Sequence, residues 1–195
     1  APMPEVIQAL NPGAGARRLH PDSIAAAATA AMTAKYGAIG HPGWIVHHDF
    51  PLIYLNTREL ERKGVRLEEA ERVVQAALSS VPGVHEALTY TGLARQRLEG
   101  VRSPEVNSFY PGRGGHVYYQ LQPYLVADGD SMGADHGSRW AYDTQVPLLW
   151  FGAGIAPGTH FTPAGVADIA PTLAAILGLV APGGVQGRVL HEILR

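Results

Sequence analysis

Residues 67–91 read LEEAERVVQAALSSVPGVHEALTYT, a helix pattern followed directly by a strand pattern. The spacing predicts a helix over 67–81, because its apolar residues recur at intervals of three and four and therefore share one face. Pro82 and Gly83 then end the helix. Residues 84–91 favour an extended chain. A helix that leads within two residues into a strand is typical of α/β and α+β domains.

Further strands are predicted on both sides of this stretch. Residues 44–48 and 52–56 are rich in β-branched and aromatic side chains, and residues 116–122 alternate between two faces. In the last segment one face carries Val117, Tyr119 and Leu121, and the other carries Tyr118, Gln120 and Gln122. Residues 147–151 form a continuous apolar run, which predicts a strand covered on both faces.

The remaining predicted helices are shorter or less regular. They cover 22–36 with Asp22 as N-cap, a short segment from Thr57 to Gly64, residues 92–99, and Ile169 to Leu177 after Asp168. Residues 188–194 fit either a short helix or a strand. Because helices and strands alternate and no linker interrupts them, the sequence predicts one domain of the α/β or α+β class.

Composition excludes several classes of protein. The chain has 195 residues, 46% of them apolar and 16% charged, so it can bury a core and is not a charge-rich disordered segment. The net charge is −2, and we therefore expect neither a nucleic acid nor a membrane surface as partner. The chain contains no cysteine, which excludes disulfides, thiolate metal sites and cysteine nucleophiles.

Neither end of the sequence shows a targeting or spanning segment. Residues 169–187 lack Asp, Glu, Lys and Arg, but prolines and glycines interrupt them, so they do not predict a membrane helix. The chain begins Ala1-Pro2-Met3-Pro4, with neither an initiator methionine nor a signal peptide pattern. We therefore expect it to be processed or cut from a larger protein.

Three polar segments are weak candidates for ligand sites. His47-His48-Asp49 suggests a metal site, but adjacent strand residues point to opposite faces and do not readily share an ion. Asp128-Gly129-Asp130 fits either a site for a hard cation or a plain turn. Gly112-Arg113-Gly114-Gly115 fits either a phosphate cradle or a tight turn.

Asp135-His136-Gly137-Ser138 is a stronger candidate because of its position. It lies in a polar loop before the predicted strand 147–151, and ligands of open α/β sheets collect at loops beyond strand ends. A neutral histidine ring is a good zinc ligand, and Gly137 allows close approach of the backbone. Taken alone, the tetrapeptide also fits an ordinary turn.

Several segments, taken in chain order, carry a family resemblance. They are Ile53-Tyr54-Leu55-Asn56, the helix 67–81 with Pro82-Gly83-Val84, Tyr90-Thr91, Asn107-Ser108-Phe109, His136-Gly137-Ser138, Tyr142-Asp143-Thr144, Val146-Pro147-Leu148-Leu149, Gly152 with Gly154-Ile155, and Asp168-Ile169-Ala170-Pro171-Thr172-Leu173 with Gly178. Together they resemble the C-terminal part of the alkaline phosphatase superfamily. Within it they look most like the type I phosphodiesterase/nucleotide pyrophosphatase branch and its bacterial single-chain phosphatase relatives.

The resemblance implies an α/β fold, namely the C-terminal part of a mixed sheet flanked by helices. Residues 1–195 would form the C-terminal portion of a single hydrolase domain whose N-terminal catalytic half is absent. Ala1-Pro2-Met3-Pro4-Glu5 looks like the stretch directly after the family's central Asp-His-Gly metal motif. Such enzymes use a Thr or Ser nucleophile and two zinc ions to hydrolyse phosphate esters.

Only one ligand of that zinc site maps onto this chain, and it is His136. Ser138, Tyr142, Asp143 and Thr144 match neighbouring positions and are expected to support its loop. Asp168 matches a helix start and is interpreted as structural. The nucleophile and the other ligands are expected upstream of Ala1, so no catalytic residue is assigned. Because a catalytic zinc site needs about three protein ligands, we expect the isolated chain to be inactive.

Two residues depart from the family pattern. Asp135 stands where relatives often have a small hydroxyl residue, and whether it assists metal binding stays open. His116 stands where relatives tend to have an acidic residue.

Two other functions remain open: a sulfatase-like member of the same superfamily, and a truncated, non-catalytic binding module. The substrate-binding residues, the choice between monoester and diester, and the oligomeric state are not predicted. A periplasmic or extracellular location is implied by the resemblance alone.

Overall fold

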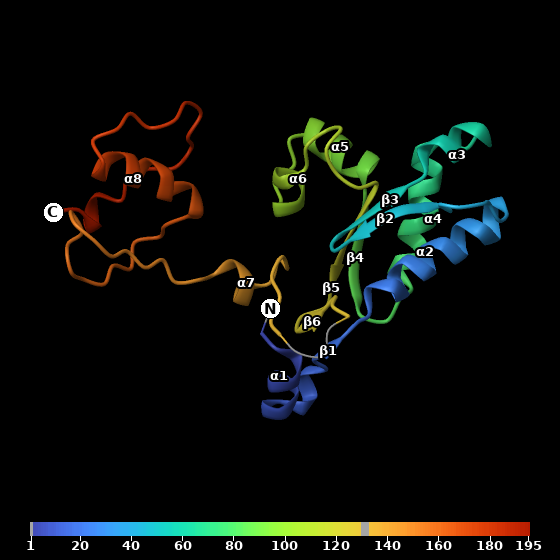
Figure 1. Ribbon diagram of the computed structural model, residues 1–195, viewed down its shortest axis with the longest axis horizontal. Helices are drawn as coiled ribbons and strands as arrows, with labels where there is room; N and C mark the ends of the chain where they lie inside the picture. Colours follow the sequence, from blue (N-terminus) through green and yellow to red (C-terminus); the bar gives the residue numbers. More distant parts are fainter. Residues whose placement is uncertain (1, 130–132) are drawn as a thin grey trace. The chain divides into compact units, whose positions relative to one another are not determined.

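The computed structural model describes residues 2–129 and 133–195, which divide into two compact units, 1–145 and 146–195. The first unit carries the sheet and most of the helices (Figure 1). Its elements are α1 (Pro4–Leu10), the 3-10 helix η1 (Pro12–Ala14), β1 (Arg17–Arg18), α2 (Pro21–Tyr36), β2 (Ile45–Asp49), β3 (Leu52–Leu55), α3 (Thr57–Arg62), α4 (Leu67–Ser79), β4 (Val84–Thr89), α5 (Tyr90–Leu98), α6 (Pro104–Ser108), β5 (Val117–Leu121), β6 (Leu125–Val126) and α7 (Ala141–Thr144).

Most predicted elements of this unit form close to their expected positions. The helix predicted at 67–81 is α4, and the strand predicted at 84–91 is β4 followed at once by α5. The helix predicted from Asp22 begins one residue earlier, at Pro21. The ring of His20 is its N-cap and accepts the backbone N–H of Asp22 at 3.3 Å. Pro21 fits there because the first helical N–H needs no partner.

The strands form two separate sheets, one antiparallel and one parallel. Four strands lie in the order β2-β3-β5-β4, and every neighbouring pair is antiparallel. A separate two-stranded pair joins β1 to β6 in parallel, with Arg17 opposite Leu125 and Arg18 opposite Val126. This parallel pair joins a segment near the start of the chain to the segment that follows β5.

The two faces of the four-stranded sheet bury different clusters. The first is the main core, packed between the sheet and the helices α2 and α4 (Figure 1); its fully buried members include Ile24, Met32, Ile53, Val74, Leu78, Val117, Tyr119 and Leu121. The second lies under α5 and α6 and consists of Leu93, Val106 and Phe109, with Tyr118 and Leu88 against it. The alternation predicted for 116–122 agrees with this arrangement, since Val117, Tyr119 and Leu121 belong to the first cluster and Tyr118 packs against the second.

The second unit contains short helices joined by irregular chain. They are η2 (Val166–Asp168), α8 (Ile169–Ile176) and the 3-10 helix η3 (His191–Ile193), and one isolated bridge joins Ile155 to Leu194. The helix predicted from 169 is therefore present, and of the two alternatives left open for 188–194 the structure has a short helix.

The strand predicted at 147–151 is wrong for this chain, because these residues form no strand and are largely exposed, Leu149 to 89%. A strand needs a backbone partner on at least one side, and within 146–195 only the bridge at Ile155 is formed. None of the helices in the described part of the chain has both the length and the apolar character that crossing a bilayer requires.

Candidate functional site

The loop that carries His136 leaves the histidine side chain accessible to solvent. The imidazole is exposed, and the backbone N–H of His136 donates to Oδ1 of Asp135 at 2.8 Å. Gly137 follows with a φ of 103°, a conformation that L side chains rarely adopt and that glycine adopts without strain. Asp135 therefore shapes the backbone beside the imidazole, and the ring itself is left accessible.

Asp143 fixes the other side of this loop. Its Oδ2 accepts hydrogen bonds from the backbone N–H of Ser138 at 3.1 Å and from the Ser138 hydroxyl at 2.5 Å. Hydrogen bonds to an ionised carboxylate are stronger than those between neutral groups. Ser138 and Asp143 thus hold the chain two residues after His136.

Two aromatic residues anchor the same segment to the sheet. The indole N–H of Trp140 donates to the carbonyl oxygen of Leu121, the last residue of β5, at 3.1 Å. The Tyr142 hydroxyl accepts the backbone N–H of Tyr124 at 2.9 Å, and the two tyrosine rings stack with centroids 5.1 Å apart. The structure therefore brings Ser138, Tyr142 and Asp143 together in the geometry expected of residues that support the loop.

His136 lies at the edge of two cavities in the first unit. One has a volume of about 600 Å³ and extends from His136 over α5, α6 and the loop 110–115. The other has about 510 Å³ and is bordered by His48, Asp49, Phe50 and Asp135. His136 is thus accessible from two sides.

The residues of the larger cavity were not predicted as a site from the sequence. Tyr90 and Phe109 line it, and both stand in segments that carry the family resemblance. Tyr110 and Arg113 line it as well, although they are distant from His136 in the sequence. The one available signal was that several resembling segments, far apart along the chain, belong to one family pattern.

The two histidines of β2 do not share a metal site. His47 packs against the ring of Tyr54, whereas Nε2 of His48 lies 2.8 Å from the Tyr119 hydroxyl. Burial raises the pKa of Tyr119 and lowers the pKa of His48, so the tyrosine hydroxyl donates to a neutral imidazole. The prediction that neighbouring strand residues separate these rings agrees with their different partners.

His116 has a backbone role. Its Nδ1 accepts the backbone N–H of Leu55 at 2.9 Å, so the ring must be neutral with its proton on Nε2. Burial lowers the pKa of His116 and favours this neutral form. An imidazole nitrogen thus accepts the backbone N–H at the last residue of β3.

The two loop candidates show no ligand cluster. Asp128 accepts Nη1 of Arg18 at 3.2 Å, and Asp130, its proposed co-ligand, lies outside the described residues. The loop 112–115 forms a turn that opens no helix, and a Cβ at Gly115 would lie 2.8 Å from the carbonyl oxygen of Ile53. That glycine therefore serves close packing of the loop against β3.

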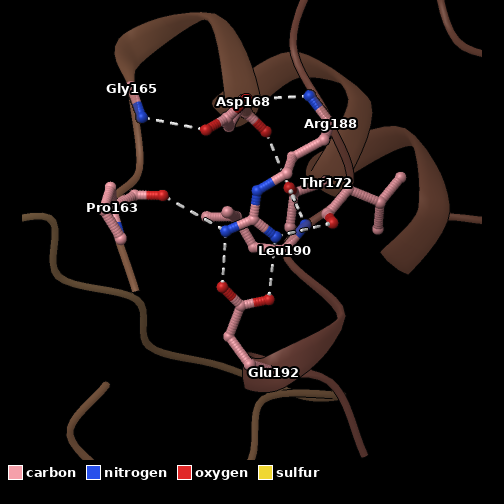
Figure 2. Close-up of polar contacts among 8 residues, drawn as sticks. Pro163, Gly165, Asp168, Thr172, Arg188, Leu190 and Glu192 are labelled. Carbon is pink, nitrogen blue, oxygen red and sulfur yellow. Dashed lines mark hydrogen bonds and ion pairs between the residues drawn. The ribbon is translucent and has the colours of Figure 1, made fainter. Parts of the chain in front are cut away.

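Asp168 holds the second unit together, as Figure 2 shows. Its carboxylate accepts the backbone N–H of Gly165 at 2.8 Å and that of Arg188 at 2.8 Å. One turn later the buried Thr172 donates its hydroxyl to the carbonyl oxygen of Asp168 and accepts the N–H of Leu190. The side chain of Arg188 pairs with Glu192 at 2.7 Å. These contacts support the interpretation of Asp168 as structural.

The described residues do not complete a metal site on their own. Among residues 2–129 and 133–195, no three side chains of His, Asp or Glu gather closely enough to hold an ion. His136 has the exposed ring that a ligand needs, but a catalytic zinc requires about three protein ligands. Further ligands would have to come from outside the described part of this chain.

Comparison with known proteins identifies relatives of this chain, although no family model matches it. The alkaline phosphatase PhoD of Zymomonas mobilis is 30% identical over 160 residues, which cover 73% of this chain and 28% of that protein. The "Calcium-transporting ATPase" of Myroides odoratus is 28% identical over 144 residues, or 73% of this chain and 26% of that protein. The alkaline phosphatase PafA of Elizabethkingia meningoseptica is 24% identical over 143 residues, or 73% of this chain and 26% of that protein.

A solved structure gives the same relationship at the level of the fold. A crystal structure of wild-type alkaline phosphatase PafA matches with a TM-score of 0.79 and 21% identity, over 97% of this chain and 35% of that one. This chain spans between 16% and 28% of the length of the curated relatives that it matches. Since the sequence matches and the shared fold agree, they support placing this chain in the alkaline phosphatase superfamily.

Proposed function

We propose that this chain is the C-terminal portion of a zinc-dependent phosphate ester hydrolase. The observation that carries the proposal is the exposed His136, held in a loop by Asp143 and Ser138, in a chain whose relatives are named alkaline phosphatases. A small phosphate ester is the substrate. In this proposal the nucleophile and most metal ligands belong to an N-terminal half that this sequence does not include.

His136 supplies one ligand to one of two zinc ions. Bound zinc stabilises negative charge on the attacking and leaving oxygens of a phosphoryl group. The role of the residues described is positional: Asp143 and Ser138 fix the loop, and Trp140 and Tyr142 tie it to the end of β5. A ligand that is positioned in advance binds metal with less loss of conformational freedom.

The finer assignments also remain proposals. The sequence segments resemble the phosphodiesterase/nucleotide pyrophosphatase branch, whereas four of the five matched relatives are named alkaline phosphatases. We therefore propose phosphate monoesters as the first substrates to test and diesters as the second. A location outside the cytoplasm is proposed on the resemblance alone.

Zinc content and hydrolysis, measured together, test this function. In the full-length protein that carries this chain, His136→Ala should lower bound zinc, measured by elemental mass spectrometry, and reduce hydrolysis of p-nitrophenyl phosphate by at least about a hundredfold. His191→Ala is the matched control, because that exposed histidine lies in the second unit, and it should leave both quantities unchanged.

Two results would contradict the proposal. Unchanged zinc content in His136→Ala would remove the ligand assignment. Strong zinc-dependent hydrolysis by the 195-residue chain alone would show that the N-terminal half is not needed.

A further inference from the structure

The larger cavity beside His136 has an aromatic interior. Its volume of about 600 Å³ lies within the range of small-molecule sites. Four aromatic rings line it, those of Tyr90, Phe109, Tyr110 and Tyr118, together with the side chains of Leu52 and Leu93. The lining also includes polar and charged side chains, among them Glu105, Arg113, Arg139 and Asp143. Aromatic and aliphatic walls combined with polar groups are typical of pockets that bind a ring.

The walls of this cavity are formed in advance by buried contacts. Leu93 and Phe109 are 6% and 9% exposed, and the rings of Tyr90 and Phe109 meet edge to face with centroids 5.0 Å apart. The Tyr90 hydroxyl accepts the backbone N–H of Gly112 at 3.2 Å, which ties α5 to the loop over the cavity. Nη1 of Arg97 donates to the carbonyl oxygen of Phe109 at 2.8 Å. Because the walls are already ordered, binding a ligand costs little conformational entropy.

The charges around the cavity largely compensate one another. Arg139 lies 3.0 Å from a carboxylate oxygen of Glu86 and 3.3 Å from one of the buried Glu105. Asp143 accepts two hydrogen bonds from Ser138. Burial, together with the nearby Glu105 carboxylate, raises the pKa of Tyr118 to about 12, so its hydroxyl stays neutral. The interior thus favours an uncharged ring.

We propose that this cavity binds the alcohol half of the substrate, and that this half is an uncharged aromatic group. The inference rests on the proposed hydrolase function, since it places the phosphate at His136 and the ring between α5, α6 and the loop 110–115. Tyr110 lines the cavity and is 62% exposed, and the Arg113 guanidinium lies 6.0 Å from its ring centroid. Aryl phosphate monoesters are the substrate class.

Direct binding tests the cavity without any phosphate chemistry. The 195-residue chain is titrated with 1-naphthol and followed by fluorescence, for the wild type and for two tryptophan variants. Ser108→Trp fills the cavity, because Ser108 lines it and is exposed. Ser80→Trp adds the same side chain at an exposed position just after α4 and away from the cavity. Circular dichroism confirms that each variant folds.

We expect Ser108→Trp to weaken naphthol binding by about tenfold or more, since burying an aromatic ring contributes roughly 1.5–3 kcal/mol. Ser80→Trp should bind as the wild type does. Equal binding by both variants, or no binding by the wild type, overturns the pocket. If adenosine binds more tightly than naphthol, the cavity prefers a nucleoside, which contradicts the proposal that it binds a simple aromatic ring.

Kinetic measurements on the full-length protein distinguish the inference about the cavity from the proposed hydrolase function. Ser108→Trp should raise KM for 1-naphthyl phosphate about tenfold and leave KM for ethyl phosphate unchanged, because the ethyl group does not reach the aromatic walls. Equal effects on both substrates overturn the inference and leave the hydrolase standing. If naphthol binds but no phosphate ester is hydrolysed, the proposed function fails and with it the assignment of the ring as a leaving group.

Discussion

The carboxylate of Asp143 binds Ser138 twice, through the backbone N–H at 3.1 Å and through the hydroxyl at 2.5 Å. This pair closes a loop of six residues that begins two positions after His136. These two hydrogen bonds close the loop from within, while Trp140 and Tyr142 inside it bind to Leu121 and Tyr124. The position of the imidazole therefore depends on a residue seven positions away in the sequence.

Asp143→Ala should destabilise the chain by about 1–3 kcal/mol, because it leaves the Ser138 N–H and hydroxyl without their acceptor. Urea unfolding monitored by tryptophan fluorescence measures the change. The matched control is Asp22→Ala, since the Asp22 side chain is 90% exposed, and it should cost at most about 0.5 kcal/mol. If both substitutions cost the same, Asp143 does not fasten the loop.

Acid should weaken the sheet through His116. Because burial holds the pKa of His116 below its ordinary value of 6.5, the unfolded chain takes up a proton first as the pH falls. The free energy of unfolding should therefore be constant above about pH 7 with respect to this group and should decrease from about pH 6.5 downward. His48, whose pKa is also lowered by burial, acts in the same direction.

Unfolding at pH 7.5, 6.0 and 5.0 measures this effect. The variant His116→Asn lacks the titrating ring and should show a smaller loss of stability between pH 7.5 and 5.0 than the wild type. His41→Asn, at an exposed position before β2, is the control and should lose as much as the wild type. An unchanged slope in His116→Asn would mean that protonation of this ring is not coupled to unfolding.

Thr172→Val should loosen the second unit while keeping the shape of the side chain. The valine neither accepts the N–H of Leu190 nor donates to Asp168, and a buried polar group left without a partner costs about 1–3 kcal/mol. Hydrogen exchange should show faster exchange of the Leu190 amide. The control Thr159→Val, at an exposed position of the same unit, should leave that amide's protection unchanged. Equal protection in the two variants would contradict the role of Thr172.

The sequence predicted best what depends on local pattern. The spacing of Val74 and Leu78 specifies a helix whatever surrounds it, and the alternation along β5 specifies two faces. The strand predicted at 147–151 is wrong for the opposite reason. Its apolar run favours burial, but a strand also needs a neighbouring backbone, which no local pattern supplies.

The site divides in the same way. His136 stays a predicted ligand, proposed because its short motif resembles a family pattern, and Ser138 and Asp143, which bind each other, lie within seven positions of it. The aromatic cavity could not be predicted, because Tyr90 and Phe109 reach it only through the pairing of β4 with β5 and the packing of α5 on α6. Contacts between distant parts of the chain follow from the fold and are not encoded at any one position.

The apolar run 146–151, in which Val146, Leu148, Leu149 and Phe151 are exposed, has a consequence for how this chain behaves in solution. These four exposed apolar side chains form a surface on which two copies adhere, so the chain produced alone should self-associate as its concentration rises.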